Sequence, residues 1–311
     1  MSEFRLEVFL AVARLCSFTK AASEMLVSQP AISKQIKELE REFGVQLFVR
    51  MNNRVSLTKE GEIFRGYAER ISQTYRELKG EMNQCVGRIS GTLSIGASTT
   101  AAQYILPQVI SQFKEQNPDV EISLITGNSE YIESLVTNNI VRLGIVEGIT
   151  HKKEFHYTHL LHDELVLIRS TNGDGREEVG IEDLKSIPLV VRERGSGTLE
   201  VIGTRLREQG ISPSSLNIVM RLGSSEAIKR YVLAGSCYAI ISVAAIVDEL
   251  RAGTLSIVDI EGLKIERDFS FIQESGSQDR LSELFTNFAI TKSYRRYKLS
   301  ICFPPLSSLP L

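Results

Sequence analysis

The sequence lacks most of the features by which secreted, membrane-spanning and disulfide-bonded proteins are recognised. Its four cysteines, Cys16, Cys85, Cys237 and Cys302, are scattered without a C-x-x-C pair, so neither a zinc site nor a disulfide framework is indicated. No apolar run approaches the roughly 20 residues that a membrane-spanning helix requires. The first residues also lack the basic region of a signal peptide. We therefore expect a cytoplasmic protein with no membrane partner, whose cysteines are reduced, small and buried.

Catalytic and metal-binding signatures are also missing. The chain has no G-x-S-x-G, no Walker-type glycine loop and no H-E-x-x-H. All four histidines fall within a dozen residues, but no two have the i, i+4 spacing of a helical pair. On a strand, His156 and His162 would share one face while His159 would point to the other. We expect a polar strand edge here, with no metal, no cofactor and no catalytic residue.

Charge divides the chain into two parts. Residues 1–90 carry 14 Lys and Arg against 11 Asp and Glu, a net of +3. The remaining residues carry 22 against 27, a net of −5. The sign of this asymmetry agrees with a DNA-binding head on a neutral-to-acidic body.

Residues 17–43 have the pattern of two helices joined by a tight turn. In the first helix the apolar residues recur at i, i+3, i+4 and i+7, namely Phe18, Ala21, Ala22 and Met25. Ser28 is placed to cap the second helix, and Pro30 lies in its first turn. That helix has an apolar side (Ile32, Ile36, Leu39, Phe43) and a polar, basic side (Pro30, Ser33, Lys34, Lys37, Arg41). The pattern suits insertion into the DNA major groove, although a surface helix–turn–helix of any helical domain would also show it.

Several motifs occur here together: SFTKAA at 17–22, VSQPAIS at 27–33, GVQLFVR at 44–50 and LTKEG at 57–61. With them, residues 4–71 closely resemble the DNA-binding domain of LysR-type transcriptional regulators, and weaker similar features continue to about residue 288. We predict a winged helix-turn-helix over residues 1–58, whose hairpin carries Arg50 and Arg54 at its tip. The DNA-binding residues are predicted to be Thr19, Ser28, Gln29, Pro30, Ser33, Lys34, Lys37, Arg50 and Arg54.

The proline-free segment from Lys59 to about Val86 predicts one long helix. Its apolar residues recur at alternating threes and fours, at Phe64, Tyr67, Ile71, Tyr75, Leu78, Met82 and Cys85. Such a seam suits pairing with a second copy, although a helix lying on its own domain could carry it too. In this position the resemblance implies a dimerising linker helix, which with its hinge would occupy residues 59–90.

From Thr92 onward, strand and helix patterns alternate, which predicts an α/β fold with a parallel sheet and helices on both faces. The order is similar to the effector-binding region of the same family, which is itself similar to type 2 periplasmic binding proteins. The resemblance implies two α/β lobes joined by two crossing strands within residues 91–295. Lobe one would comprise residues 92–163 and 269–292, ending in a helix at 281–289, and lobe two residues 164–268. Residues 296–311 form a tail without an assigned structure.

Four segments of this region follow strands and open helices, and they are rich in Ser, Thr and Gly. In such folds ligands bind between the lobes, where strand ends and helix N-termini favour anions. Any one segment alone would be explained by helix capping. Taken together they predict a site for a small oxyanion or carboxylate, with Tyr104 and Gly148 nearby. The predicted effector-binding residues are Ser98, Thr99, Thr100, Asn128, Glu147, Arg194, Ser196, Gly197, Thr198 and Ser224.

The whole pattern predicts a sequence-specific DNA-binding transcriptional regulator that a small effector, expected to be anionic, modulates. Its partners would be promoter DNA, further copies of itself in a dimer or tetramer, and RNA polymerase. A solute receptor for transport is the first alternative, disfavoured by residues 1–90 and by the lack of a signal peptide. An enzyme built on the α/β body is the second, disfavoured by the missing motifs.

Overall fold

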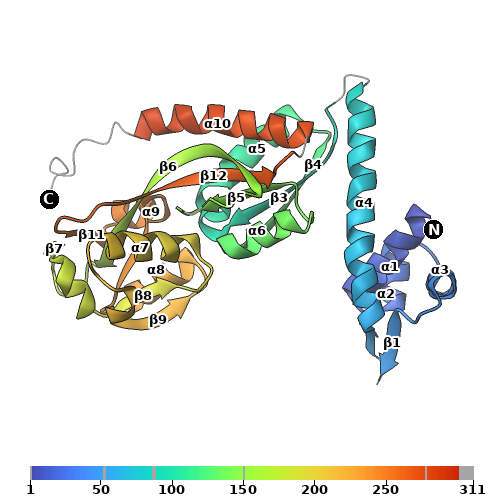
Figure 1. Cartoon of the computed structure of the whole chain (residues 1–311), viewed down its shortest axis with the longest axis horizontal. Helices are drawn as coiled ribbons and strands as arrows, with labels where there is room; N and C mark the ends of the chain where they lie inside the picture. Colours follow the sequence, from blue (N-terminus) through green and yellow to red (C-terminus); the bar gives the residue numbers. More distant parts are fainter. Residues whose placement is uncertain (1, 52–53, 86–88, 150, 277–278, 301–311) are drawn as a thin grey trace. The chain divides into compact units, whose positions relative to one another are not determined.

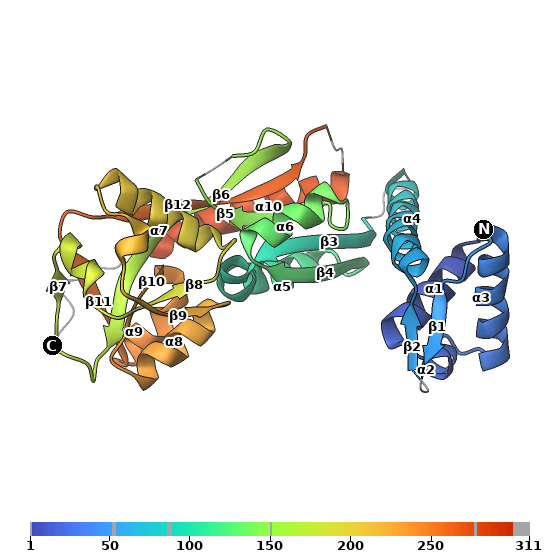
Figure 2. The same ribbon diagram turned by 60° about the horizontal axis from the view of Figure 1, so that its bottom comes forward.

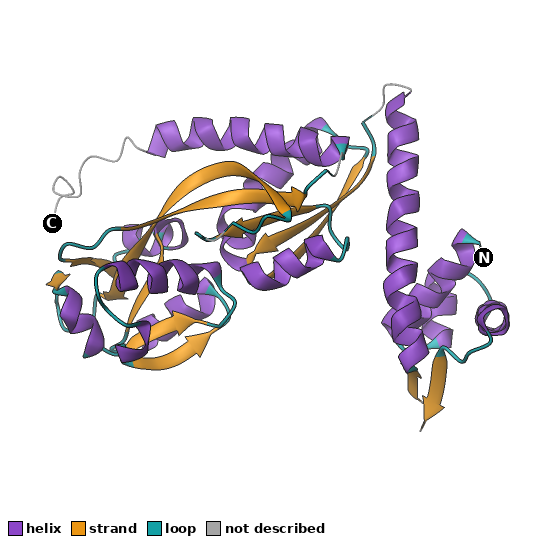
Figure 3. Cartoon of the chain, viewed as in Figure 1, coloured by secondary structure: helices purple, strands orange, loops and turns teal. Residues whose placement is uncertain are grey.

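The computed structural model describes residues 2–51, 54–85, 89–149, 151–276 and 279–300 (Figure 1). The chain divides between Gly91 and Thr92 into two compact units, which are described one at a time. Among the described residues, no helix has both the length and the apolarity of a bilayer-spanning segment. Helices and strands alternate in the mixed α/β manner that the sequence predicts (Figure 3).

Unit one is a winged helix-turn-helix followed by a long helix. Its elements are α1 (Glu3–Leu15), α2 (Phe18–Glu24), α3 (Gln29–Phe43), the hairpin strands β1 (Phe48–Met51) and β2 (Arg54–Leu57), and α4 (Lys59–Cys85). The helix boundaries follow from capping. Ser17 Oγ accepts a hydrogen bond from Lys20 N at 3.2 Å, and Ser28 Oγ accepts one from Ala31 N at 3.4 Å. Helix α3 ends at Gly44, whose φ of 70° is left-handed.

The core of unit one holds α3 by its apolar side. Ile32, Ile36 and Leu39 are buried with the residues of α1 and α2. Phe64 of α4 joins this core, because its ring centroid lies 4.7 Å from that of Phe9. Phe64 therefore belongs to its own domain and not to the predicted seam. The prediction for Cys16 was also wrong, because Cys16 is exposed at the left-handed end of α1.

Beyond this contact, α4 exposes a stripe of large apolar side chains. Their exposed fractions lie between 40% and 58%, and the residues are Tyr67, Ile71, Tyr75, Leu78 and Met82. We call these five residues the α4 stripe. The side chain of Cys85, the last predicted member, lies outside the described part of the chain. A row of exposed apolar side chains is unfavourable in water and is typical of a protein–protein contact, so the stripe is a candidate contact surface.

Unit two contains a ten-stranded sheet and two lobes. Lobe one contains β3 (Gly91–Ser98), the π-helix η1 (Ala101–Ile105), α5 (Leu106–Gln116), β4 (Val120–Gly127), α6 (Ser129–Thr137), β5 (Leu143–Glu147) and α10 (Arg280–Ser300). Lobe two contains β7 (Glu178–Val179), η2 (Ile181–Lys185), β8 (Leu189–Arg192), α7 (Gly197–Glu208), η3 (Pro213–Ser215), β9 (Ile218–Leu222), α8 (Ser225–Ala234), β10 (Tyr238–Ser242), η4 (Val243–Ala245), α9 (Val247–Arg251) and β11 (Leu255–Ile260).

Two long strands, β6 (Phe155–Ser170) and β12 (Ile265–Glu274), run through both lobes side by side (Figure 2). They pair antiparallel from Leu165 and Ile265 to Phe155 and Glu274. The strand order is β4-β3-β5-β12-β6-β10-β8-β9. The sheet is therefore mixed and not parallel throughout, because the two crossing strands traverse it in opposite directions. Parallel pairing is kept within the lobes, as between β3 and β5 and between β8 and β10.

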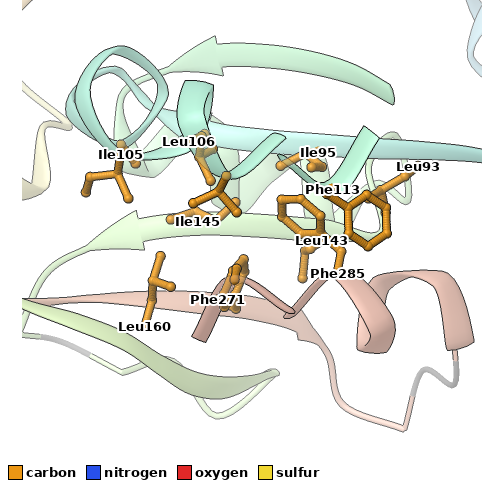
Figure 4. Packing of buried hydrophobic residues seen from close by; sticks show 14 of the residues in the cluster. Leu93, Ile95, Ile105, Leu106, Phe113, Leu143, Ile145, Leu160, Phe271 and Phe285 are labelled. Atoms are coloured by element: carbon orange, nitrogen blue, oxygen red, sulfur yellow. The ribbon is translucent and has the colours of Figure 1, made fainter. Parts of the chain in front are cut away.

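Separate apolar cores support the two lobes. In lobe one, residues from β3, β5, α5, β12 and α10 meet around Phe113 and Phe285, whose ring centroids are 5.1 Å apart (Figure 4). In lobe two, α7 buries Val201, Ile202 and Leu206 against the sheet. Both cores leave the carboxyl ends of β3, β5, β8 and β10 to polar residues.

Two helical segments differ from the prediction. Residues 101–105 form a π-helix, in which Leu106 N donates to Ala101 O, and Pro107 follows without an amide hydrogen for the carbonyl four residues back. Helix α10 continues to Ser300, well past the expected end at residue 289 and into the segment expected to be a tail. Residues 301–311 of that segment lie outside the described part of the chain.

Candidate functional site

Helix α3 presents a basic surface at its amino-terminal half. Ser28, Pro30, Lys34 and Lys37 are exposed there, as is Thr19 on α2. Gln29 and Ser33 are half-buried, and Gln29 Nε2 donates to Ser33 Oγ at 2.8 Å. Six of these residues lie at the cap and in the first turns of α3, and together with Thr19 of α2 we call them the α3 surface.

The acidic residues of α3 are held on another side. Arg5 of α1 lies 2.6 Å from a Glu38 carboxylate oxygen and 3.4 Å from one of Glu42. Arg5 thus offsets these negative charges, and Lys34 and Lys37 dominate the exposed field of α3. For the other two predicted DNA-binding residues the structure gives the backbone only. Arg50 lies opposite Val55, and Arg54 opposite Met51, in the β1–β2 hairpin; both side chains lie outside the described part.

A buried ion cluster occupies the centre of unit two. Arg267 Nε donates to Asp163 Oδ2 at 2.8 Å, and Arg267 Nη1 donates to Thr198 Oγ1 at 2.7 Å. Thr198 Oγ1 in turn donates to Glu147 Oε1 at 3.2 Å, and Ser242 Oγ donates to Asp163 Oδ1 at 2.8 Å. All five residues are at most 4% exposed. The cluster joins β5 of lobe one, α7 and β10 of lobe two, and both crossing strands.

Sequence reasoning did not predict Arg267, Ser242 or Asp163 as residues of a functional site. Arg267 lies 104 residues from Asp163 and 69 from Thr198, so no local pattern connects them. One signal was available in the sequence. Ile265, Arg267 and Phe269 are two residues apart along β12, so all three side chains lie on the same buried face of the strand. A charged residue at such a position needs a buried partner.

Six buried polar atoms, two of them in this cluster and four at strand ends and helix openings of unit two, have no hydrogen-bond partner within the described part of the chain. They are Thr99 Oγ1, Thr100 Oγ1, Glu147 Oε2, Arg192 Nη1, Ser196 Oγ and Arg267 Nη2. Thr99 and Glu147 lie at the ends of the parallel strands β3 and β5, and Arg192 ends β8. A native fold leaves few such atoms unsatisfied, so their accumulation indicates a site for a polar ligand. Five of the six can donate a hydrogen bond, and Glu147 Oε2 can only accept one when ionised.

Other predicted effector residues join the lobes directly. Asn128 Nδ2 donates to Arg194 O at 3.2 Å, and Glu130 N donates to Gly195 O at 3.2 Å. A Cβ atom on Gly197 would lie 1.8 Å from Glu147 O, so only glycine allows this approach. In the first turn of α6, the amide of Glu130 is thus already bonded to a backbone carbonyl of lobe two.

Ser98 and Ser224 act as helix caps. Ser98 Oγ accepts from Ala101 N at 3.3 Å, and Ser224 Oγ accepts from Ala227 N at 3.2 Å. A pocket of about 570 Å³ lies along α7, and Arg194, Ser196, Leu199 and Arg221 are among the residues that line it. Ser196, whose Oγ is one of the six unpartnered atoms, also lines this pocket.

A second polar contact joins the lobes at Tyr104. Its hydroxyl donates to Glu226 Oε1 at 2.5 Å, and Lys229 Nζ lies 2.7 Å from Glu226 and 2.7 Å from Glu249. Burial and the hydrogen bond to Glu226 raise the pKa of the Tyr104 hydroxyl far above its usual value. Tyr104 therefore stays protonated at neutral pH and donates to the opposite lobe.

The histidines do not alternate as predicted. His162 Nδ1 lies 2.9 Å and His159 Nε2 3.3 Å from the same Asp268 oxygen. The reason is a register shift between Phe269 and Ser270, which breaks the alternation of β6 and turns His159 to the side of His162. The hydrogen bond to Asp268 raises the pKa of His162. Within the described ranges, no three His, Cys, Asp or Glu side chains are arranged to hold a metal ion.

The sequence matches two family models. One, described as "Bacterial regulatory helix-turn-helix protein, lysR family", covers residues 4–62, and the other, "LysR substrate binding domain", covers residues 87–292. "HTH-type transcriptional regulator CysL" of Bacillus subtilis (strain 168) is 30% identical over 269 residues, which make up 86% of this chain and 89% of the relative.

Two solved structures are similar to this one. Full-length CbnR complexed with its target DNA superposes with a TM-score of 0.73 at 22% identity, covering 94% of this chain and 100% of that one. The CcmR regulatory domain of Synechocystis PCC6803 in complex with 2-PG has a TM-score of 0.59 at 26% identity. That match covers 65% of this chain and 97% of the CcmR chain.

Proposed function

Because the chain belongs to the LysR family of bacterial transcriptional regulators, we propose that α3 reads its operator in the major groove. The protein is a DNA-binding transcriptional regulator with an effector-binding domain. The observation that carries the docking proposal is the α3 surface: Ile32, Ile36 and Leu39 are buried, Glu38 and Glu42 pair with Arg5, and the lysines of α3 are exposed. Gln29 and Ser33 would then face base edges, and Thr19, Ser28, Pro30, Lys34 and Lys37 the backbone. The hairpin arginines, Arg50 and Arg54, would contact phosphate or the minor groove.

Replacing Lys34 by alanine is expected to weaken DNA binding about equally on all sequences. A lysine that contacts phosphate releases a counterion, so its loss lowers the slope of log affinity against log salt by about one. Replacing Ser33 or Gln29 should instead relax base preference. Gel shifts with the chain's own upstream region at several salt concentrations measure both effects.

The matched control for this experiment is Lys185→Ala, which removes an exposed lysine of unit two that pairs with Glu182. It should leave affinity and salt slope unchanged. Docking of α3 would be wrong if Lys34→Ala behaved like this control.

The effector is proposed to be a small anion at the six unpartnered atoms. Hydroxyls of Thr99, Thr100 and Ser196 and the guanidinium nitrogens of Arg192 and Arg267 are donors that lack partners within the described residues. The similar CcmR regulatory domain was solved in complex with 2-PG, which supports a small-molecule site in this domain. Since the atoms come from both lobes, an occupant would favour one lobe arrangement over another. Contacts from Asn128 and Ser224 are a weaker part of this proposal, because their side chains already serve the protein's own structure, whereas among the described residues Arg194 is bonded only through its backbone carbonyl and lines the adjacent pocket.

Calorimetry on the full chain with sulfate, sulfite, phosphate and small carboxylates is the direct test. Each charge-assisted hydrogen bond is worth roughly 1.5–3 kcal/mol, so Thr100→Val or Ser196→Ala should weaken a bound anion about tenfold or more. Ser98→Ala, which removes a cap instead of a ligand donor, is the control and should alter melting temperature more than affinity. Unaltered affinity in both test variants would place the anion elsewhere.

The remaining expectations complete the proposal. The chain would work in the cytoplasm as a dimer through the α4 stripe, with a second pairing of unit two giving a tetramer, and it would act on RNA polymerase at the promoter. We assign it no catalytic activity, no cofactor and no metal.

A further inference from the structure

The buried ion cluster contains two carboxylates and one guanidinium. Arg267 is shared by two carboxylates, with Nε at 2.8 Å from Asp163 Oδ2 and Nη1 at 3.4 Å from Glu147 Oε1. Both carboxylates are 2% exposed, so each of their oxygens needs a hydrogen-bond donor from the protein or from a ligand. Resting on the proposed effector site, we propose that the effector carries a hydroxyl or ammonium group beside its anionic group, and that Glu147 Oε2 accepts a hydrogen bond from it.

The hydrogen-bond directions leave one carboxylate oxygen over. Thr198 Oγ1 accepts from Arg267 Nη1, so its own hydrogen is directed to Glu147 Oε1. Both carboxylate oxygens of Asp163 already accept a hydrogen bond, Oδ1 from Ser242 and Oδ2 from Arg267. Glu147 Oε2 alone receives no donor from the described residues. Leaving such an acceptor buried is costly, and only a donor can satisfy it.

The same guanidinium fixes where the ligand's anionic group lies. Arg267 Nη2 is a buried donor without a partner in the described chain, and Nη1 of the same group contacts Glu147. Because Arg267 Nη1 and Glu147 Oε1 are 3.4 Å apart, the two unpartnered atoms belong to groups in contact, and we take a carboxylate on Nη2 to bring its neighbouring carbon within reach of Glu147 Oε2. A hydrogen atom on that carbon leaves the acceptor empty, whereas a hydroxyl or ammonium fills it. This arrangement selects hydroxy or amino acids over plain carboxylates.

Propionate, lactate and alanine test this directly, because they differ at one carbon by hydrogen, hydroxyl or ammonium. Their affinities for the full chain are measured by calorimetry. Lactate, alanine or both should bind about tenfold or more tightly than propionate. Whichever of the two binds tighter identifies the donor as hydroxyl or ammonium.

Two matched variants isolate the free oxygen. Glu147→Gln and Asp163→Asn each remove one carboxylate charge beside Arg267, but only the first changes the unpartnered acceptor. In Glu147→Gln, the affinity for lactate or alanine should come within about threefold of the affinity for propionate. In Asp163→Asn, the tenfold or greater preference for lactate or alanine should remain. Thermal unfolding identifies any variant that fails to fold, and Glu147→Asp then serves as the replacement that keeps the charge and withdraws the oxygen.

The outcomes separate this inference from the function on which it rests. Equal binding of all three acids by the natural chain, or a preference that survives Glu147→Gln, overturns the role of Glu147 and leaves the anion site standing. If none of the three binds, and neither sulfate nor phosphate does, the effector site itself is wrong and the inference falls with it.

Discussion

Exchanging Ile71 and Leu78 together for lysine is expected to give monomers that bind operator DNA about a hundredfold or more weakly. Both residues lie on the α4 stripe, where they are 42% and 49% exposed in the single chain. Two lysines there would place charge in an apolar contact and prevent pairing. A monomer loses the second DNA-binding head and with it the gain of about 10²–10⁴ that linked binding provides. Analytical ultracentrifugation and gel shifts measure the two effects.

The control keeps the stripe apolar. Ile71→Met with Leu78→Met changes the same positions without adding charge, and such swaps are usually tolerated. This variant should sediment and bind DNA as the natural chain does. An oligomer that survived the lysine pair would show that the α4 stripe is not the pairing surface.

Replacing Arg267 by methionine is expected to lower the free energy of unfolding by about 3–5 kcal/mol. Methionine leaves Asp163 and Glu147 buried as negative charges without their cation, and breaking a buried ion pair on one side costs this much. The natural volume is roughly kept, so the loss is mainly electrostatic. Urea unfolding at neutral pH, followed by a probe in unit two, measures it.

Lys264→Met is the control, because Lys264 is an exposed lysine next to the same strand and pairs with Glu266. It should change stability little. Adding Asp163→Asn to Arg267→Met should recover part of the loss, since it removes one of the two stranded charges. Strictly additive effects of the two substitutions would contradict the cluster as the source of the stability.

Local signals made the DNA-binding half predictable. The cap at Ser28, the stop at Gly44 and the apolar spacing of α3 all act within a few residues, and all are found in the structure. The limit of such reasoning is visible at Phe64. It has the correct spacing for the seam, but the aromatic rings of Phe9 and Phe43, far away in the sequence, decide that it packs inward.

The effector region was less accessible because its key contacts are long-range. Helix openings identified Thr100 and Ser196, whereas Arg267 depends on partners supplied by three other elements, β5, β6 and α7. His159 shows a second limit. The prediction for its side chain assumed the regular alternation of a strand. That alternation is broken by a register shift in the pairing of β6 with β12, which the sequence of β6 alone does not reveal.

Lobe two is inserted in the chain between the two crossing strands, which pair from Leu165 and Ile265 onward, and this has a consequence for the order in which the lobes fold. The core of lobe one combines Leu93 and Phe113 with Phe271 and Phe285, which the ribosome adds after all of lobe two. The core of lobe two needs nothing beyond Ile265. During synthesis the inserted lobe can therefore complete its packing while the surrounding lobe still waits for its last strand and helix. Of the two lobes, the one whose first strand is made earlier therefore finishes folding later.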